Sequence, residues 1–253
     1  MNLKEIRQEA KKRFHGICRV CRECNGVVCA GEFPGIGGAE SGSSFINNYK
    51  ALAALRVKMR VVHAASNPET GLTLLGQKLS MPILGAAVAG AKMNFKEIIS
   101  EEELATAFVA GARQAGTLAM TGDAPDPLIY ATGLRVIRAN EREGIPITKP
   151  RDQASIIAHF REAEAAGCVA VGIDVDAAGI VPMRAAGQPV EPKTVSQLKE
   201  LVQSTTLPLI LKGIMCVEDA FAAREAGAAA IVVSNHGGRV LDHTPGTARF
   251  CLR

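Results

Sequence analysis

The chain has 253 residues, of which 47% are hydrophobic and 21% are charged, with 25 glycines and no tryptophan. This length can bury a sizeable core, and the composition excludes disordered, collagen-like and small disulfide-stapled proteins. The formal net charge is +4 with only two tyrosines, so we expect no nucleic-acid surface, and no apolar run approaches the roughly 20 residues that a membrane-spanning helix needs.

The first 14 residues predict a short basic amphipathic helix, and no apolar signal-peptide stretch is present, so we expect a cytoplasmic location. Residues 15–48 have neither helical nor strand periodicity, and their glycine- and serine-rich end predicts loop. The residues that follow predict three short features: a helix near 49–54, an extended piece at 57–63 and a turn at 67–68.

Four of the seven cysteines lie close together, at Cys18, Cys21, Cys24 and Cys29. In a reducing compartment this spacing suggests metal or redox chemistry rather than disulfides. Thiolates so close in sequence can converge on one ion, which predicts an Fe–S cluster or a zinc ion. The spacing matches no standard signature, so four reduced structural cysteines are an equal alternative.

From residue 79 onward, short apolar runs alternate with stretches of helical periodicity. The predicted strands are 82–89, 117–121, 145–148, 169–175, 207–212 and 229–234. The predicted helices are 100–115, 127–142, 154–166, 195–204 and 217–226, the first with a capping box from Ser100 to Glu103. We therefore divide the chain into an N-terminal part with a Cys-rich extension, 1–78, and a repeating part, 79–253.

Repeated strand–helix units predict an α/β protein, either a barrel or a doubly wound sheet. No GxGxxG motif follows the first strand, whereas polar and glycine residues follow most of the strands. That placement is typical of a TIM-type (β/α)8 barrel, whose chemistry lies at the carboxyl ends of the strands. Only about six of the eight units are present, so the barrel is expected to be incomplete.

The most informative motif is Ser-Asn-His-Gly-Gly-Arg at 234–239, directly after the last predicted strand. The imidazole of His236 suits proton abstraction near neutral pH, and the guanidinium of Arg239 can bind a carboxylate through two hydrogen bonds. The two glycines allow the backbone to pass close to a flat ligand. The competing interpretation is a solvated surface loop.

This motif, together with Leu-Lys-Gly-Ile at 211–214 and Leu-Ser-Met-Pro-Ile at 79–83, resembles the FMN-dependent α-hydroxy acid oxidase/dehydrogenase family. That family includes glycolate oxidase, lactate oxidase and L-lactate dehydrogenases of the flavocytochrome type. The resemblance implies a (β/α)8 barrel, FMN as cofactor, and oxidation of a small 2-hydroxy acid to a 2-oxo acid. It leaves open the electron acceptor and the choice between oxidase and dehydrogenase. We expect the full-length form to be a homo-oligomer.

The resemblance also implies roles for single residues. His236 would be the base, Asp174 its carboxylate partner, Arg239 a clamp for the substrate carboxylate, and Lys212 the cation beside the flavin ring. The flavin contacts would come from Gly85, Ala86, Ala87, Val88, Thr121, Lys212 and Ser234, and Arg184 would be a second carboxylate-binding group. Asp176 is expected only to cap the turn that follows Asp174.

Several positions depart from the family pattern. A substrate-contacting Tyr is absent, and Lys149-Pro150 occupies its region. Neither the Asp-Gly-Gly-x-Arg motif nor the later Gly-Arg pair that hold the FMN phosphate is present. We therefore expect a truncated form with impaired FMN binding. Two alternatives stay open: a related FMN barrel such as a type 2 isopentenyl-diphosphate isomerase, and a non-catalytic remnant or metal-binding module built on the cysteines.

Overall fold

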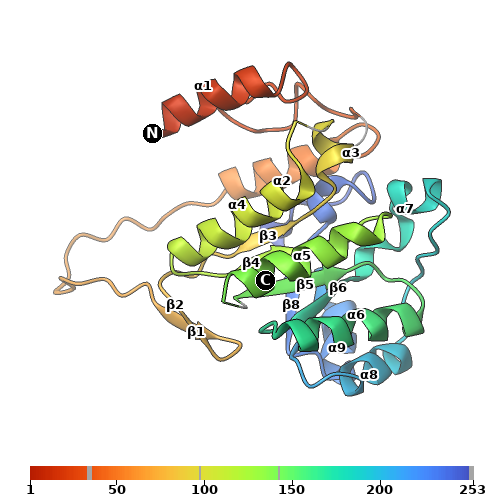
Figure 1. Cartoon of the computed structure of the whole chain (residues 1–253). Coiled ribbons are helices and arrows are strands. Elements are labelled where there is room, and N and C mark those ends of the chain that lie inside the picture. Colours follow the sequence, from red (N-terminus) through yellow and green to blue (C-terminus); the bar gives the residue numbers. More distant parts are fainter. Residues whose placement is uncertain (33–35, 97, 142, 251–253) are drawn as a thin grey trace.

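A curved sheet of six parallel strands forms the centre of the protein (Figure 1). The computed structural model describes residues 1–32, 36–96, 98–141 and 143–250. The strands lie side by side in chain order: β3 (Gly85–Val88), β4 (Ala119–Thr121), β5 (Gly144–Thr148), β6 (Val171–Asp174), β7 (Leu209–Ile214) and β8 (Ala230–Val233). This order is that of a (β/α)8 barrel, and the sheet forms a half-barrel. The six predicted strands and the incomplete barrel are confirmed.

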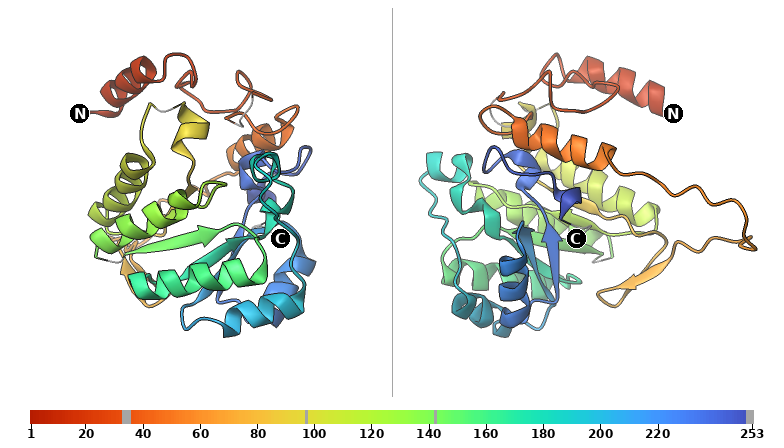
Figure 2. Two further views of the ribbon diagram at one scale, coloured as in Figure 1. Left: turned by 45° about the vertical axis from the view of Figure 1, so that its right-hand side comes forward. Right: turned by 180° about the vertical axis from the view of Figure 1, so that it is seen from behind.

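Helices between successive strands cover the outer face of the sheet (Figure 2). They are α4 (Glu101–Gln114), α5 (Pro127–Ala139), α6 (Gln153–Ala166), α8 (Val195–Gln203) and α9 (Val217–Ala226). The predicted capping box is present, because the Ser100 side chain accepts from the backbone N–H of Glu103 and the Glu103 side chain accepts from that of Ser100. The predicted helix 127–142 ends at Ala139, and residue 142 lies outside the described residues.

The side chains of the strands belong to two apolar clusters on opposite faces of the sheet. Val171 and Ile173 of β6 pack in the cluster that includes the helices. Ile147 of β5 and Ile210 of β7 pack in a second cluster on the inner face. Because side chains alternate along a strand, Asp174 shares the inner face. This alternation points the last polar residues of the strands into the barrel.

A hairpin of β1 (Leu72–Leu74) and β2 (Gln77–Leu79) packs its leucines against the inner cluster. It was not predicted, since two strands of three residues give almost no periodic signal. Further short elements are α3 (Ala91–Phe95), α7 (Val181–Ala185), and the 3-10 turns η1 (Val175–Gly179), η2 (His236–Gly238) and η3 (Thr247–Arg249). Among the described residues, no helix is long and apolar enough to cross a bilayer.

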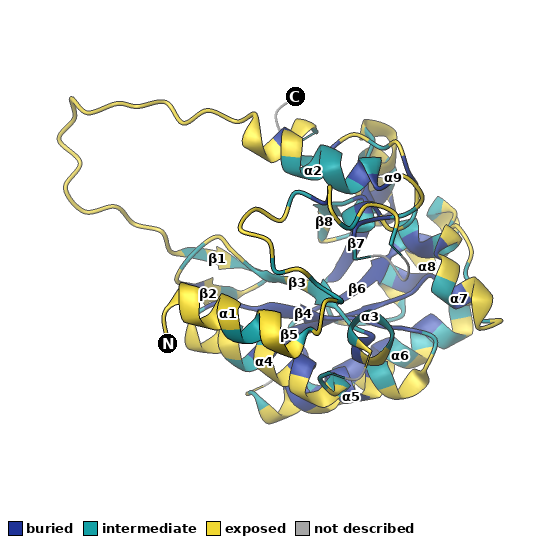
Figure 3. Ribbon diagram, turned by 90° about the horizontal axis from the view of Figure 1, so that it is seen from above, coloured by how far each residue is buried: buried dark blue, intermediate teal, exposed yellow. Residues whose placement is uncertain are grey.

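The N-terminal part contains α1 (Leu3–Arg13) and α2 (Ser43–Ala53), which confirms the first predicted helix. The second helix begins earlier than predicted, inside the serine-rich stretch that we interpreted as loop. A distant carboxylate explains the difference: Asp242 accepts hydrogen bonds from the Ser43 hydroxyl and the Ser44 backbone N–H. Segment 57–63 is exposed and unpaired, with Val57 96% exposed, and it belongs to a long loop (Figure 3).

Candidate active site

A cavity of about 520 Å³ lies at the carboxyl ends of the parallel strands. Each strand from β3 to β8 contributes lining residues from its end or from the loop after it, among them Val88, Asp123, Lys149, Asp174, Lys212 and Ser234. Residues of the N-terminal part, including Phe14, Cys18, Cys24 and Phe45, line the same cavity. The sheet therefore gathers groups that are far apart in sequence around one cavity.

Asp174 at the end of β6 is the centre of a buried charge network. Its Oδ2 lies 2.8 Å from Nζ of Lys149, and its Oδ1 lies 2.5 Å from Nζ of Lys212. Asp174 and Lys212 are direct partners in the β6–β7 register, so the second contact is a consequence of strand pairing. Burial alone would raise the pKa of Asp174, but the ammonium groups of Lys149 and Lys212 hold it well below its ordinary value.

His236 follows β8 in an unusual backbone conformation. Its φ is +56°, a left-handed value that is uncommon outside glycine, and such strain is concentrated at functional sites. The ring Nδ1 lies 3.0 Å from Oδ1 of Asp176 and 3.9 Å from Oδ1 of Asp174. The hydrogen bond therefore joins His236 to Asp176, whereas the sequence analysis paired it with Asp174 and gave Asp176 only a capping role.

The surroundings of His236 favour its neutral form. Burial and the nearby ammonium of Lys149 lower the pKa of the imidazole, although Asp174 and Asp176 act in the opposite direction. Because the Asp176 carboxylate accepts a hydrogen bond from Nδ1–H, the lone pair of the neutral ring lies on Nε2. His236 lines the cavity, and its Nε2 lies 3.4 Å from Nζ of Lys149. This is the protonation state that a general base requires.

The loop that carries His236 is held by α2. Gly238 has a φ of +75°, and a Cβ at this position would lie 2.5 Å from the backbone nitrogen of Phe45, so α2 packs where only glycine fits. The Asn48 side chain of α2 donates to Oδ1 of Asn235 at 2.7 Å. The segment before α2 also takes part, since Ala39 N–H donates to Gly238 O at 2.7 Å. The N-terminal part therefore supports the loop that carries His236.

One wall of the cavity consists of small side chains at the end of β3. Ala86, Ala87, Val88 and Ala89 line it, and Lys212 and Ser234 line the same cavity. A wall of methyl groups leaves room for a flat ring, and the Lys212 ammonium in the same cavity suits a ring that gains negative charge. The residues at this end of the cavity therefore fit the isoalloxazine ring of FMN.

Most of the predicted site residues line this cavity: Ala86, Ala87, Val88, Asp174, Lys212, Ser234, His236 and Arg239. Three are placed elsewhere. Gly85 packs against β4, because a Cβ there would lie 2.9 Å from the Ala119 Cβ. Thr121 directs its hydroxyl at α5, where a Cβ on Gly133 would lie 2.8 Å from it. Arg184 is exposed on α7.

The four clustered cysteines do not form the predicted metal site. Within the described ranges, the only set of three potential ligand groups that converge is Asp174, Asp176 and His236. Cys18 and Cys24 line the cavity, whereas Cys21 and Cys29 do not, and both Cys21 and Cys24 are exposed. Burial and the neighbouring thiols raise the pKa of Cys24, which disfavours the thiolate that metals bind. An Fe–S cluster or zinc ion is not supported.

Sequence reasoning missed the roles of three further residues at the site, Lys149, Asp123 and Arg151. Lys149 contacts both Asp174 and His236. Asp123, whose side chain is fully buried, forms a two-pronged ion pair with Arg151 at 2.9 and 3.0 Å. The sequence feature that could have identified them is a lysine, a proline and an arginine directly after a buried strand. Charged side chains in that place are seldom solvated.

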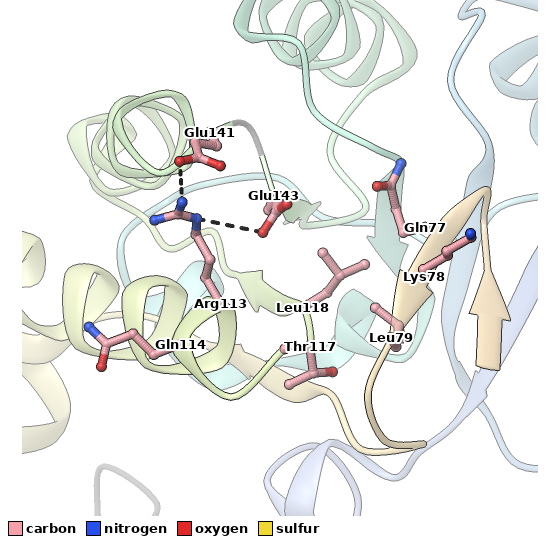
Figure 4. A pocket seen from close by; sticks show the side chains of 10 residues that line it. Gln77, Lys78, Leu79, Arg113, Gln114, Thr117, Leu118, Glu141 and Glu143 are labelled. Atoms are coloured by element: carbon pink, nitrogen blue, oxygen red, sulfur yellow. Dashed lines mark hydrogen bonds and ion pairs between the residues drawn. The ribbon is translucent and has the colours of Figure 1, made fainter. Parts of the chain in front are cut away.

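A second cavity, of about 410 Å³, lies at the opposite ends of the strands between the β1–β2 hairpin and α4 (Figure 4). Arg113 points toward Glu141 and Glu143 there and forms ion pairs with both. These pairs are at least one-third exposed, so they contribute little to stability. The groups suited to catalysis lie in the first cavity.

A parallel half-barrel with polar groups at the carboxyl ends of its strands defines a protein of the (β/α)8 class. The sequence matches the FMN-dependent dehydrogenase family over residues 36–185 and 182–252. The chain therefore belongs to this family, and the resemblance found in its motifs is confirmed.

Known proteins agree with this assignment. The L-lactate oxidase of Lacticaseibacillus rhamnosus is 27% identical over 255 residues, covering 87% of this chain and 66% of the relative. The glycolate oxidase of Spinacia oleracea is 28% identical over 250 residues, covering 83% and 64%. A mandelate oxidase structure with a C4a-OH-FMN adduct is 28% identical with a TM-score of 0.63, covering 84% of this chain and 66% of that one. The chain thus spans just under two thirds of the length of these curated relatives.

Proposed function

We propose that this chain oxidises a small 2-hydroxy acid to the 2-oxo acid with FMN as the acceptor of the hydride. The observation that carries the proposal is the contact between His236 Nδ1 and the Asp176 carboxylate, in a cavity that His236, Arg239 and Lys212 line together. The relatives support the substrate class, since they include a lactate oxidase, a glycolate oxidase and a mandelate oxidase.

In this proposal four charged or titratable groups of the site have one task each. His236 Nε2 accepts the proton of the substrate hydroxyl, and the Asp176 carboxylate stabilises the imidazolium that results. Arg239 binds the substrate carboxylate and so directs the hydroxyl toward the base. FMN, when bound, supplies the site that accepts the hydride from C2 of the substrate. Lys212, which lines the same cavity, would offset negative charge on the ring with its ammonium.

The experiment supplies the purified chain with FMN in the absence of oxygen and adds lactate, glycolate or mandelate, with a 3-hydroxy acid as the control. We expect one or more of the 2-hydroxy acids to bleach the flavin and to yield the matching 2-oxo acid. The 3-hydroxy acid has no hydroxyl on the carbon beside the carboxylate, so it is expected to leave the flavin oxidised. Flavin that stays oxidised with every 2-hydroxy acid refutes the proposal.

We also propose that the 253-residue chain retains FMN weakly by itself. The support is that the ring end of the cavity has suitable residues, whereas the family's two phosphate-binding motifs do not occur in this sequence. Fluorescence titration of FMN with the chain measures the affinity directly. Stoichiometric FMN that stays with the chain through gel filtration contradicts this part of the proposal.

A further inference from the structure

Lys149 is a buried cation of the cavity to which the steps above give no task. Its side chain is 9% exposed, and its Nζ lies 2.8 Å from Oδ2 of Asp174 and 3.4 Å from Nε2 of His236. We propose that Lys149 is a catalytic residue whose ammonium binds the oxygen of the reacting hydroxyl and holds it against His236 Nε2. The inference rests on the proposed oxidation of a 2-hydroxy acid and adds a residue to it.

The position of the two nitrogens supports this role. An oxygen that donates its proton to Nε2 must come within about 3 Å of that nitrogen, and the 3.4 Å between the two nitrogens leaves positions where the same oxygen is also within hydrogen-bonding distance of Nζ. The direct contact from Nζ to Nε2 is 3.4 Å, longer than an ordinary hydrogen bond, so an incoming oxygen displaces it at little cost. Because an ammonium has three N–H donors, Lys149 keeps its bond to Asp174 while it donates to the substrate.

The charges balance through the step. The hydroxyl O–H bond breaks and its proton moves to Nε2, while the electron pair stays on the oxygen and becomes the second C–O bond as the hydride leaves C2 for the flavin. Negative charge builds on an oxygen that lies between the Lys149 ammonium and the new imidazolium. That charge offsets the repulsion between the two cations, so stabilisation is greatest when the proton has moved.

Hydrogen bonds to the Asp123 carboxylate fix the backbone at Lys149. Its N–H donates to Oδ2 of Asp123 at 2.9 Å, and the same carboxylate accepts two hydrogen bonds from Arg151. Thr148, the last residue of β5, also donates to Asp123, at 3.2 Å. Pro150 follows directly and restricts the chain further. A side chain fixed in this way can direct a hydrogen bond with little loss of conformational entropy.

Six charged groups of the described residues face the ring of His236 or line the cavity with it: Asp123, Lys149, Asp174, Asp176, Lys212 and Arg239. Of these, Lys149 is the cation within hydrogen-bonding range of Nε2. Its removal is therefore expected to change the titration of His236, whereas removal of a surface lysine is not. Lys199, which pairs with Glu225 on the outer helices, is a matched control.

The test compares Lys149→Met, Lys149→Arg and Lys199→Met with the unmodified chain. Removing one donor to a developing oxyanion slows a reaction by about 100-fold or more, and we expect this loss of the flavin-reduction rate for Lys149→Met, with partial recovery in Lys149→Arg. Binding of a deoxy analogue, which keeps the carboxylate and lacks the hydroxyl, is expected to stay unchanged. The NMR titration of His236 is expected to move to higher pH in Lys149→Met and to stay unchanged in Lys199→Met.

The outcomes separate the two proposals. If the unmodified chain does not reduce the flavin, the proposed function fails and this assignment fails with it. If the unmodified chain is active and Lys149→Met is equally active, the assignment of Lys149 alone is wrong. Equal weakening of the deoxy analogue and the hydroxy acid would also overturn it, since Lys149 would then bind the carboxylate. An unchanged titration of His236 would refute the contact itself.

Discussion

Replacement of Asp174 by Asn tests the buried charge network most sharply. The substitution keeps the shape of the side chain and removes the negative charge between Lys149 and Lys212, whose side chains are 9% and 10% exposed. Two buried ammonium groups then lack their counter-ion, and loss of one partner from a buried ion pair costs about 3–5 kcal/mol. We expect the free energy of unfolding of Asp174→Asn to fall by this amount in urea denaturation followed by circular dichroism.

The control is Asp152→Asn, at the exposed N-cap of α6, for which we expect a loss of at most about 1 kcal/mol. Adding Lys149→Met to Asp174→Asn removes one of the two uncompensated charges, so part of the stability is expected to return. The reasoning is refuted if Asp174→Asn is no more destabilised than Asp152→Asn.

The same network gives a pH dependence with a definite sign. Burial alone would raise the pKa of Asp174, but Lys149, Lys212 and His236 hold it well below the ordinary value. A folded-state pKa below the unfolded value of about 3.9 stabilises the protein at neutral pH, and that stabilisation is lost as the pH falls below about 4 toward the folded-state pKa. Acidification is therefore expected to destabilise the unmodified chain more than Asp174→Asn. Equal slopes of the free energy of unfolding against pH in the two proteins would contradict this prediction.

Three further substitutions follow from the structure. Asp176→Asn removes the acceptor of the His236 Nδ1–H bond, so flavin reduction by a 2-hydroxy acid is expected to slow by about 100-fold or more in stopped-flow measurements, with FMN affinity unchanged. Gly213→Ala is expected to destabilise the protein by about 2 kcal/mol or more, because φ is +111° and the new Cβ would lie 2.5 Å from the Cγ of Asp176. Its control is Gly111→Ala, in open space on α4, which is expected to stabilise the protein by about 0.5–1 kcal/mol. Equal effects of the two substitutions in thermal unfolding would contradict this prediction. Asp242→Ala removes a carboxylate that binds the start of α2, so faster proteolysis of the N-terminal part is expected, and an unchanged cleavage rate would count against that role.

The half-barrel was predictable because its strands carry a strong local signal. Ile145, Ile147, Ile173 and Ile210 lie in short apolar runs bounded by glycine and polar residues, which is the pattern of a strand buried on both faces. The position of Lys212 at the end of such a run was sufficient to predict that it lies in the cavity. The apolar runs and the polar residues at their ends were therefore sufficient to predict where the site lies.

The partner of His236 was not predictable from the pattern. Asp174 and Asp176 are two residues apart, and which of them meets the imidazole depends on how η1 turns the chain after β6. In the structure, Asp174 forms ion pairs with the two lysines, and Asp176 forms the hydrogen bond with the histidine. Sequence spacing of this kind places a carboxylate at the site without deciding which cation it contacts.

The start of α2 shows a second limit of the sequence. Gly42, the N-cap, has no side chain to accept a hydrogen bond, and the serines that follow are typical of loops. The helix begins there because Asp242, distant in sequence, accepts from the backbone N–H of Ser44. A cap supplied by tertiary structure leaves no local signal.

The central claim is that His236 takes the proton of a 2-hydroxy acid as the flavin is reduced. The most direct measurement is the rate of anaerobic flavin reduction by the best substrate in the unmodified chain and in His236→Asn, both saturated with FMN. We expect His236→Asn to bind FMN as before and to reduce it about 1000-fold more slowly or not at all. Reduction at an undiminished rate in His236→Asn would show that His236 is not the base.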